Sequence, residues 1–483
     1  MTLPHGFAVA LDRDTRVLDG GRALLGGRPS RLLRLTPRAR ALLSGRTLTV
    51  RDAAGAALAE RLLDAAMAHP VLTGPAIPAT ATGQSCTYVI PVRDRPRQLA
   101  RLLSCIPADA PVIVVDDASH RPEAVAAVAA HHGARLLSLP ENLGPAGARN
   151  AGLRQVTTRH VAFVDSDIEL PPHTVPTLLA HFADPSVAMA VPRITALGTD
   201  DREGWISRYE GTRSSLDLGA HPASVRPGTP VSWVPSACAV ARVDVLRTLG
   251  GFDDGMRMGE DVDLCWRMTD SGWRVRYDPS VHAAHEHRTG FTDWFRRKAE
   301  YGTGAHPLAV RHPTAIAPAV LAPWSAGLLL AVAAQRRWSL PVAAALWGVT
   351  AVRVSRTLAG TGQPARQALR LTTAGAVSAL AQGGALATRH WWPVTVAGCL
   401  VSRRVRRAAA AAAVLDIALE YRPRRTGLDP VRYAAARRLD DLAYGAGVWW
   451  SALKGGSPAA LLPRVVTKSS STRRRPPRSR TIS

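Results

Sequence analysis

The chain of 483 residues is poor in cysteine and in acidic residues. Its five cysteines have no paired spacing, so we expect reduced thiols and no disulfide framework. Reduced thiols are typical of a cytoplasmic protein, and no signal peptide is recognisable at the start. Only 37 acidic residues oppose 61 lysines and arginines, a net charge of +24. The basic residues are dispersed and no nucleic-acid module is recognisable, so we expect anionic lipid headgroups as a partner, and no nucleic acid.

Uncharged runs long enough to cross a bilayer are scarce. Residues 314–335 carry no charge and just reach bilayer thickness, although Pro318 and Pro323 would kink a helix there. Residues 371–388 form a weaker candidate. We therefore expect a helical membrane-associated region over residues 312–460, with one to three crossings or hairpins and a buried helical domain as the alternative. A disordered basic tail is expected over residues 461–483.

The acidic residues that are present gather at the ends of apolar segments. Residues 161–169 read as an apolar strand that ends in Asp165 and Asp167. Alternate side chains of a strand lie on the same face, so these two carboxylates could converge on Mg²⁺ or Mn²⁺ bridged to a phosphate. The same Asp-x-Asp spacing also occurs in ordinary turns.

Two earlier segments follow the same pattern. Apolar strands are predicted within residues 87–94, which end in Asp94, and within residues 111–117, which end in Asp116 and Asp117. Fully apolar strands separated by helical spacing indicate a parallel sheet, and such sheets bind ligands beyond the carboxyl ends of their strands. Each aspartate alone could cap a helix or a turn. Five of them at successive strand ends favour a binding site.

An ordered set of motifs then resembles a known family. The segments are residues 88–94, 114–119, 141–153, 163–167, 250–254 and 259–267. Together they resemble the inverting family 2 glycosyltransferases of GT-A fold, over roughly residues 84–305. The resemblance implies an α/β fold with a mostly parallel sheet, a nucleotide-sugar donor, and Mg²⁺ or Mn²⁺ as cofactor.

The resemblance also implies roles for residues of the donor site. Those assigned to the nucleotide sugar are Pro91, Val92, Asp94, Asp116, Asp117, Asn142, Gly147, Arg149, Asn150 and Asp165. Those assigned to the metal are Asp167, Asp165 and His285, with His287 as the fallback. Glycine permits close approach of the backbone, and a helix that starts near Pro145 would offer free N–H groups to phosphate.

The acceptor side is assigned in the same way. Asp261, with Glu260 beside it, would be the catalytic pair, and Asp261 would take the proton from the attacking hydroxyl. A carboxylate near a helix N-terminus is expected to stay ionised, although both acids could simply cap that helix. Trp233 and Trp266 are assigned to the acceptor pocket, where a tryptophan could stack on a ring or belong to the core.

The first 80 residues are expected to form a separate small domain. Residues 15–18 and 23–26 suggest a hairpin, Thr36 and Pro37 begin a helix, and residues 57–69 suggest a second helix. Residues 75–83 have the composition of a linker. This outline resembles the winged-helix domains that recognise precursor peptides, although a dimerisation or packing domain fits as well.

The three parts in this order resemble the branch of the family that works in the biosynthesis of mycofactocin, a peptide-derived redox cofactor of actinobacteria. The resemblance implies UDP-glucose as donor, the cofactor or its precursor peptide as acceptor, and a short β-glucan as product. Because nucleotide sugars are cytoplasmic, the catalytic domain should lie on the cytoplasmic side of the cell membrane. One alternative is an inner-leaflet transferase for a cell-envelope glycan or glycolipid. Another is a non-catalytic membrane scaffold of GT-A fold.

Overall fold

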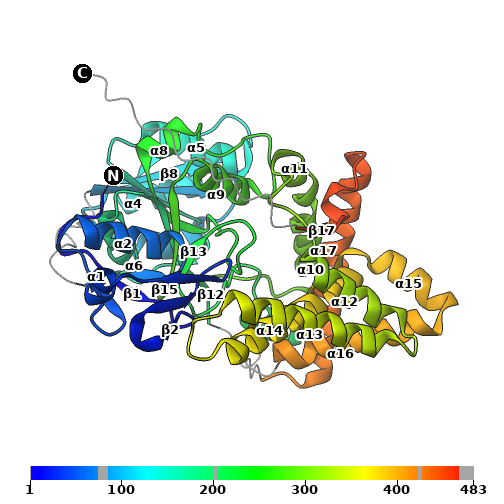
Figure 1. Ribbon diagram of the computed structural model, residues 1–483. Helices are drawn as coiled ribbons and strands as arrows, with labels where there is room; N and C mark the ends of the chain where they lie inside the picture. Colours follow the sequence, from blue (N-terminus) through cyan, green and yellow to red (C-terminus); the bar gives the residue numbers. More distant parts are fainter. Residues whose placement is uncertain (1, 74–84, 199–203, 422–426, 467–483) are drawn as a thin grey trace. The chain divides into compact units, whose positions relative to one another are not determined.

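The computed structural model describes residues 2–73, 85–198, 204–421 and 427–466. These residues belong to two compact units (Figure 1). The sheet unit contains Met1–Asp201 and Arg213–His287, and the helical unit contains Arg202–Thr212 and Arg288–Arg475. The predicted end of the transferase domain at residue 305 therefore lies beyond the end of the sheet unit. The predicted linker over residues 75–83 and most of the predicted basic tail lie outside the described residues.

The N-terminal part of the sheet unit holds two small antiparallel sheets, ordered β5-β1-β6 and β2-β3-β4. Its elements are β1 (Ala8–Leu11), β2 (Arg16–Leu18), η1 (Asp19–Gly21), β3 (Ala23–Gly26), β4 (Arg31–Arg34), α1 (Pro37–Ala41), β5 (Thr47–Thr49), α2 (Ala53–Asp64) and β6 (Ala68–Val71). The hairpin of β2 and β3 is confirmed, and so is the cap of α1, where Thr36 accepts from the N–H of Ala39 at 3.2 Å.

The second predicted helix of this part begins and ends earlier than expected. Asp52 caps α2 by accepting from the N–H of Gly55 at 2.7 Å. Residues 68–71 form strand β6 and not the last turn of a helix, because they pair with β1. Strand β5 also separates the two helices, so this part contains more sheet than the predicted outline. Its relation to winged-helix domains stays a prediction.

The main sheet of the unit has nine strands in the order β11-β15-β12-β14-β10-β7-β8-β9, with β13 paired to β15. Its strands are β7 (Cys86–Val92), β8 (Val112–Asp116), β9 (Arg135–Ser138), β10 (His160–Val164), β11 (Ile168–Glu169), β12 (Val187–Ala196), β13 (Ala223–Val225), β14 (Cys238–Arg242) and β15 (Arg274–His285). The half from β10 to β9 is parallel, as predicted. The other half is mixed, because β14 runs antiparallel to both β10 and β12. The expectation of a mostly parallel sheet is therefore wrong for that half.

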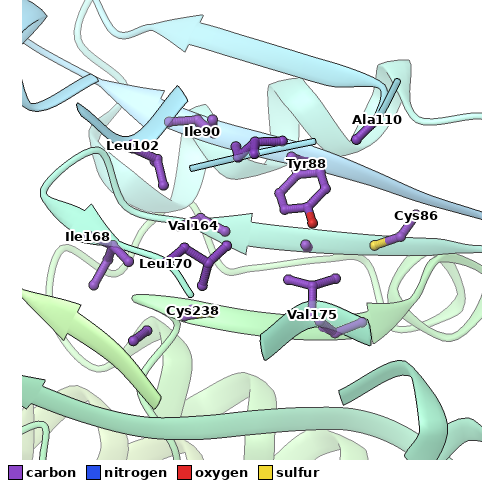
Figure 2. Close-up of a cluster of buried hydrophobic side chains, with 14 of the residues drawn as sticks. Cys86, Tyr88, Ile90, Leu102, Ala110, Val164, Ile168, Leu170, Val175 and Cys238 are labelled. Carbon is purple, nitrogen blue, oxygen red and sulfur yellow. The ribbon is translucent and has the colours of Figure 1, made fainter. Parts of the chain in front are cut away.

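Helices cover this sheet. They are α3 (Pro96–Leu103), α4 (Pro122–His131), α5 (Gly144–Gln155), α6 (Thr174–Ala180), η3 (His181–Ala183), α8 (Val243–Thr248) and α9 (Glu260–Asp270). Helix α5 packs on β7 and β8, α6 on β12, and α9 on β15. Figure 2 shows part of the core, in which Tyr88, Val164 and Cys238 from three neighbouring strands gather with Leu170. All five cysteines are free.

The helical unit is built mainly from α-helices. Its elements are α7 (Trp205–Thr212), α10 (Phe291–Thr303), α11 (Ala305–Arg311), β16 (Val320–Leu321), α12 (Pro323–Ala334), α13 (Ser339–Thr357), α14 (Pro364–Ala385), η4 (Leu386–His390), α15 (Trp392–Val401), α16 (Arg403–Tyr421), α17 (Pro430–Lys454), η5 (Ala459–Leu461) and β17 (Arg464–Val465). Lys298 of α10 is buried and pairs with Glu210 of α7 at 2.9 Å. Helix α7 thus joins this unit and not the sheet unit that surrounds it in sequence.

The predicted membrane crossings are not found. Among the described helices, none is both long enough and apolar enough to span a bilayer. The stretch over residues 314–335 is divided, because Val320–Leu321 pair with β17 and a new helix begins at Pro323. The 12 residues of α12 cover about 18 Å at 1.5 Å per residue, against a hydrocarbon core of about 30 Å.

Candidate active site

The predicted strand ends meet at one edge of the sheet. Val92 of β7 is in register with Asp116 of β8, and β10 runs parallel to β7 on its other side. Asp94, Asp116 and Asp165 therefore follow the ends of three adjacent parallel strands. This is the placement at which open α/β sheets bind ligands.

Asp117 and Asn142 fix the start of α5. The carboxylate of Asp117 accepts from the N–H groups of Leu143, at 2.7 Å, and Gly144, at 3.0 Å. Asn142 accepts from the same Gly144 N–H at 2.9 Å, and Gly144 has the positive φ of 74° that favours glycine. Burial raises the pKa of Asp117 even though these N–H groups act in the opposite direction. In this arrangement Asp117 is a helix-positioning residue, while Asp116 is buried beside it.

Asp94 belongs to a contact between two loops. Its carboxylate accepts from the backbone N–H of His120 and contacts the ring Nδ1 of His120, both at 2.7 Å. Its own N–H donates to Ser119 at 2.9 Å. The pKa of Asp94 is lowered, chiefly by the His120 N–H. These contacts connect the loop after β7 with the loop after β8.

Arg149 joins the two sides of the candidate site. It is only 3% exposed, and it donates from Nη2 to Asp165 at 2.6 Å and from Nη1 to Glu260 at 3.2 Å. Burial alone would lower its pKa, but Asp165 and Glu260 raise it on balance. The guanidinium therefore stays charged and holds the end of β10 to the start of α9.

Asn150 is next to Arg149 on α5 and organises the loop before α9. It donates to the carbonyl of Phe252 at 2.8 Å and to Asp254 at 2.5 Å, and it accepts from the N–H of Phe252 at 2.9 Å. A side chain at Gly251 would begin 2.4 Å from Asn150 Oδ1, so only glycine fits there. Gly147 is equally constrained, since its Cβ would lie 2.5 Å from Leu143. The predicted donor-site residues Gly147 and Asn150 thus have packing roles in the structure.

Asp167 is contacted by side chains from distant parts of the chain. Arg95, at the start of α3, donates to its carboxylate, and His285 Nε2 lies 3.6 Å from Asp167 Oδ2. The short strand β11 makes this possible, because Ile168 pairs with His285 of β15. Among the described residues there is no group of three or more His, Cys, Asp or Glu side chains placed to hold a metal. Asp167 and His285 are brought together as predicted, whereas Asp165 pairs with Arg149.

Asp261 lies at the first turn of α9, as predicted, beside Glu260. Its pKa is raised to about 7, first by burial and then by the negative charge of Glu260. The N–H of Val262, which donates to its carboxylate at 2.8 Å, and the charge of Arg149 act against this rise. The expectation that the helix N-terminus keeps this acid fully ionised is therefore wrong: desolvation and a like charge outweigh the helix.

Known proteins resemble this chain over part or all of its length. The model of the family "Glycosyl transferase family 2" matches residues 87–250. A pre-mycofactocin glycosyltransferase of Mycobacterium tuberculosis is 43% identical over 480 residues, which is 96% of this chain and 99% of that protein. The chain belongs to glycosyl transferase family 2. The resemblance seen in its motifs is confirmed, and the protein is a glycosyltransferase.

Two other proteins match part of the chain. An uncharacterized glycosyltransferase of Mycobacterium bovis, Mb0553, is 30% identical over 193 residues, 40% of this chain and 83% of that protein. A solved structure of a mannosyltransferase from Pyrobaculum calidifontis has a TM-score of 0.37 at 23% identity, covering 70% of this chain and 88% of that one.

The two tryptophans assigned to the acceptor pocket of this glycosyltransferase differ in burial. Trp266 is 4% exposed and donates its indole N–H to the carbonyl of Ser232 at 2.8 Å. It is a core residue that positions the segment before Val234 and has no free ring face to offer an acceptor, so its assignment is corrected. Trp233 is half-buried, and its stacking role stays a prediction.

In the glycosyltransferase the strand residues Pro91 and Val92 are enclosed to different extents. Pro91 is half-buried on β7 and Val92 is buried in the core, where its carbonyl accepts from the N–H of Asp117 at 2.9 Å. Val92 can therefore shape a nucleoside pocket only through its backbone.

The sequence-based assignment missed several residues around the Asp167 carboxylate. Besides Arg95, these are Arg101 and Gln98 of α3, which donate to Glu286 at 2.6 and 3.3 Å, and Glu286, whose N–H donates to the Asp167 carbonyl at 3.0 Å. The only signal in the sequence is that Arg95 directly follows Asp94. Nothing in the spacing shows that α3 and the end of β15 meet.

Proposed function

We propose that this glycosyltransferase moves glucose from UDP-glucose to mycofactocin or its precursor, with inversion at the anomeric carbon, and builds a short β-glucan. The acceptor is supported by the 43% identity over almost the whole chain to a pre-mycofactocin glycosyltransferase. The catalytic geometry is supported by Arg149, which connects Asp165 on the donor side to Glu260, the neighbour of Asp261.

In the proposed reaction Asp261 is the general base. The acceptor hydroxyl gives its proton to the Asp261 carboxylate as its oxygen attacks the anomeric carbon from the face opposite the diphosphate. The bond between that carbon and the diphosphate oxygen breaks in the same step, and UDP leaves. A base with a pKa near the working pH is effective, and the raised pKa of Asp261 meets this condition.

The proposed cofactor is Mg²⁺ or Mn²⁺, held by Asp167 and His285. Their donor atoms lie 3.6 Å apart, so both could reach one ion that takes the place of Arg95 at the Asp167 carboxylate. Carboxylate oxygen is the ligand that Mg²⁺ and Mn²⁺ prefer. Such an ion would offset the negative charge on the departing diphosphate. Arg149 adds a fixed positive charge beside Asp165.

We further propose that residues 1–80 recognise the peptide part of the acceptor, and that transfer takes place on the cytoplasmic side of the membrane, where nucleotide sugars are found. The envelope-glycan alternative predicts a lipid acceptor. It offers no peptide that the N-terminal part could recognise. The two proposals therefore differ in which acceptor yields a glycosylated product.

The test is UDP release from UDP-glucose with the mycofactocin aglycone as acceptor, with and without Mn²⁺, followed by mass spectrometry of the product. We expect release that needs both metal and acceptor, and a product series that differs by single hexoses. UDP release without a glycosylated aglycone would contradict the acceptor. Product from lipid acceptors only would support the envelope alternative.

The metal is tested separately by titration of the donor. Asp167→Ala should weaken UDP-glucose binding in Mn²⁺ by about tenfold or more, because the ion loses its carboxylate ligand. Without metal the variant and the parent should bind alike. Equal binding in Mn²⁺ would show that Asp167 does not hold the cation. Glu123→Gln, a change of an exposed acid on α4, is the control.

A further inference from the structure

The helical unit carries a surface that the proposed transfer reaction does not use. Between Glu300 and Asp416 the sequence contains twelve arginines and no aspartate, glutamate or lysine. The same stretch exposes large apolar side chains, among them Leu400 at 79% and Val401 at 87%. Exposed apolar groups combined with one sign of charge mark an interaction surface.

The most exposed part of this stretch is a pair of helices that we call the α15 hairpin, Trp392–Arg407. Helix α15 consists of ten uncharged residues, and none of them is buried. Helix α16 follows after Ser402, begins with Arg403 and Arg404, and also has no buried residue. In Figure 1 α15 lies at the right-hand periphery of its unit.

The hairpin has a defined geometry and is not an arbitrary loop. Arg406 donates to the carbonyl of Cys399 at 2.6 Å, which ties the end of α15 to the first turn of α16. The two helices approach closely, since a side chain at Gly398 would begin 3.1 Å from Val405. Arg403, Arg404 and Arg407 are exposed. Ten uncharged residues, about three turns of helix, thus lie directly beside a cluster of arginines.

A second segment extends this surface. Gln335 donates to the carbonyl of Arg404 at 2.7 Å, which places the turn between α12 and α13 beside the hairpin. That turn exposes Arg336, Arg337 and Trp338, the last at 51%. Tryptophan and arginine together are the residues that favour the boundary between lipid tails and headgroups.

We propose that the α15 hairpin docks the protein on the surface of an anionic lipid bilayer without crossing it. Ten residues of α-helix span about 15 Å, half of a hydrocarbon core of about 30 Å. The helix can therefore enter only the headgroup and upper acyl region, as interfacial helices do. The arginines of α16 and of the turn at Arg336 would contact the lipid phosphates.

Charge and polarity favour this occupant over two others. A second copy packed hairpin to hairpin would bring the arginines of both together, and residues 392–407 contain no acid to pair with them. Nucleic acid would satisfy the arginines but would offer no apolar layer to Leu400 and Val401. An anionic bilayer satisfies both sets of side chains. This inference does not depend on which sugar or acceptor the enzyme uses.

The test is flotation of the full chain with vesicles of phosphatidylcholine alone and of phosphatidylcholine with about 30% phosphatidylglycerol, a composition chosen to carry surface charge. We expect binding to the anionic vesicles. Val401→Asp should weaken it roughly tenfold or more, because a charged side chain replaces an apolar one that would leave water on docking. Val431→Asp is the matched control, because Val431 is 76% exposed on α17 and lies outside the hairpin.

A second variant tests the charge. Arg403→Gln combined with Arg404→Gln and Arg407→Gln should reduce binding to the anionic vesicles and reduce its dependence on salt. The control is Arg31→Gln, Arg61→Gln and Arg154→Gln, three exposed arginines of the sheet unit. UDP release in the absence of vesicles should be unchanged in all variants, which shows that they fold.

Three results would overturn the proposal. If Val401→Asp binds the vesicles as well as the parent does, the binding would belong to other basic segments, such as the tail after residue 466. An equal loss in the Val431→Asp control would show that the effect is not specific to the hairpin. A dimer in solution that Val401→Asp converts to monomer would show that the hairpin is covered by a second copy.

Discussion

The two units of this protein use charge in opposite ways. In the sheet unit, arginines reach carboxylates at strand ends, as Arg149 does to Asp165 and Arg95 to Asp167. In the helical unit, the charges of α7, α10 and α17 are paired in the interior. The sequence between Glu300 and Asp416, by contrast, contains arginines and no acidic residue. Paired charges of both signs can position and activate the reacting groups of a substrate. An excess of one charge sign beside exposed apolar side chains suits binding to an extended surface such as a bilayer. The difference separates the part that reacts from the part that docks.

The largest effect should come from the reactive carboxylate. Asp261→Asn removes the general base, and we expect kcat to fall by about 10³-fold while donor binding changes little. Steady-state transfer kinetics with donor titration measure the two quantities. Asp244→Asn, an exposed acid on α8, should leave both unchanged. Lost donor binding in Asp261→Asn would show that this acid holds the nucleotide sugar.

The next effect concerns the buried charges of the helical unit. Lys298 lies 2.9 Å from Glu210 and 3.9 Å from Asp440, so Lys298→Met would remove the cation that faces these two buried acids. We expect the free energy of unfolding to fall by about 3–5 kcal/mol. Urea unfolding followed by tryptophan fluorescence is suitable, because nine of the twelve tryptophans belong to this unit.

Two controls sharpen this prediction. Lys454→Met, at the exposed end of α17, should change the same free energy by less than about 0.5 kcal/mol. Adding Glu210→Gln to Lys298→Met should recover part of the loss, because one uncompensated charge is then removed. No recovery would mean that Lys298 acts through packing and not through its charge.

A smaller effect should appear in the pH dependence of transfer. Asp261 acts as a base only when ionised, so kcat should fall as the pH drops through the raised pKa of about 7. Glu260→Gln removes the like charge that raises this pKa, so the acidic limb should move to lower pH. Glu123→Gln on α4 is the control. An acidic limb that stays in place would argue that burial alone sets the pKa.

The smallest effect should be that of the docking surface on folding. Val401 is exposed, so Val401→Asp places no charge in the protein interior and should change the free energy of unfolding by less than about 0.5 kcal/mol. The same change at Val448, which is fully buried on α17, should destabilise the unit severely. A large cost at Val401 would show that α15 packs inside the protein in solution.

The sequence predicted the sheet unit well where local pattern and chemistry agree. The apolar strands ending in Asp116 and Asp165 and the helix start at Glu260 appear as expected. It predicted the helical unit poorly, because an apolar stretch such as residues 314–335 has the same composition whether it crosses a bilayer or packs as a short strand and helix. The start of α12 at Pro323 is a local feature. The pairing of Val320 with β17 needs a partner far along the chain, which the local sequence does not show.

By itself, then, the sequence determined the family, the parallel half of the sheet and the carboxylates at its edge, because period and strand-end chemistry are local. It also determined the excess of arginine that marks the docking surface. Tertiary structure alone decided that Arg149 connects Asp165 with Glu260, that β11 brings His285 to Asp167, and that Trp266 is a core residue. It also decided the pKa of Asp261, because burial and the distance to a like charge depend on groups that only folding brings together.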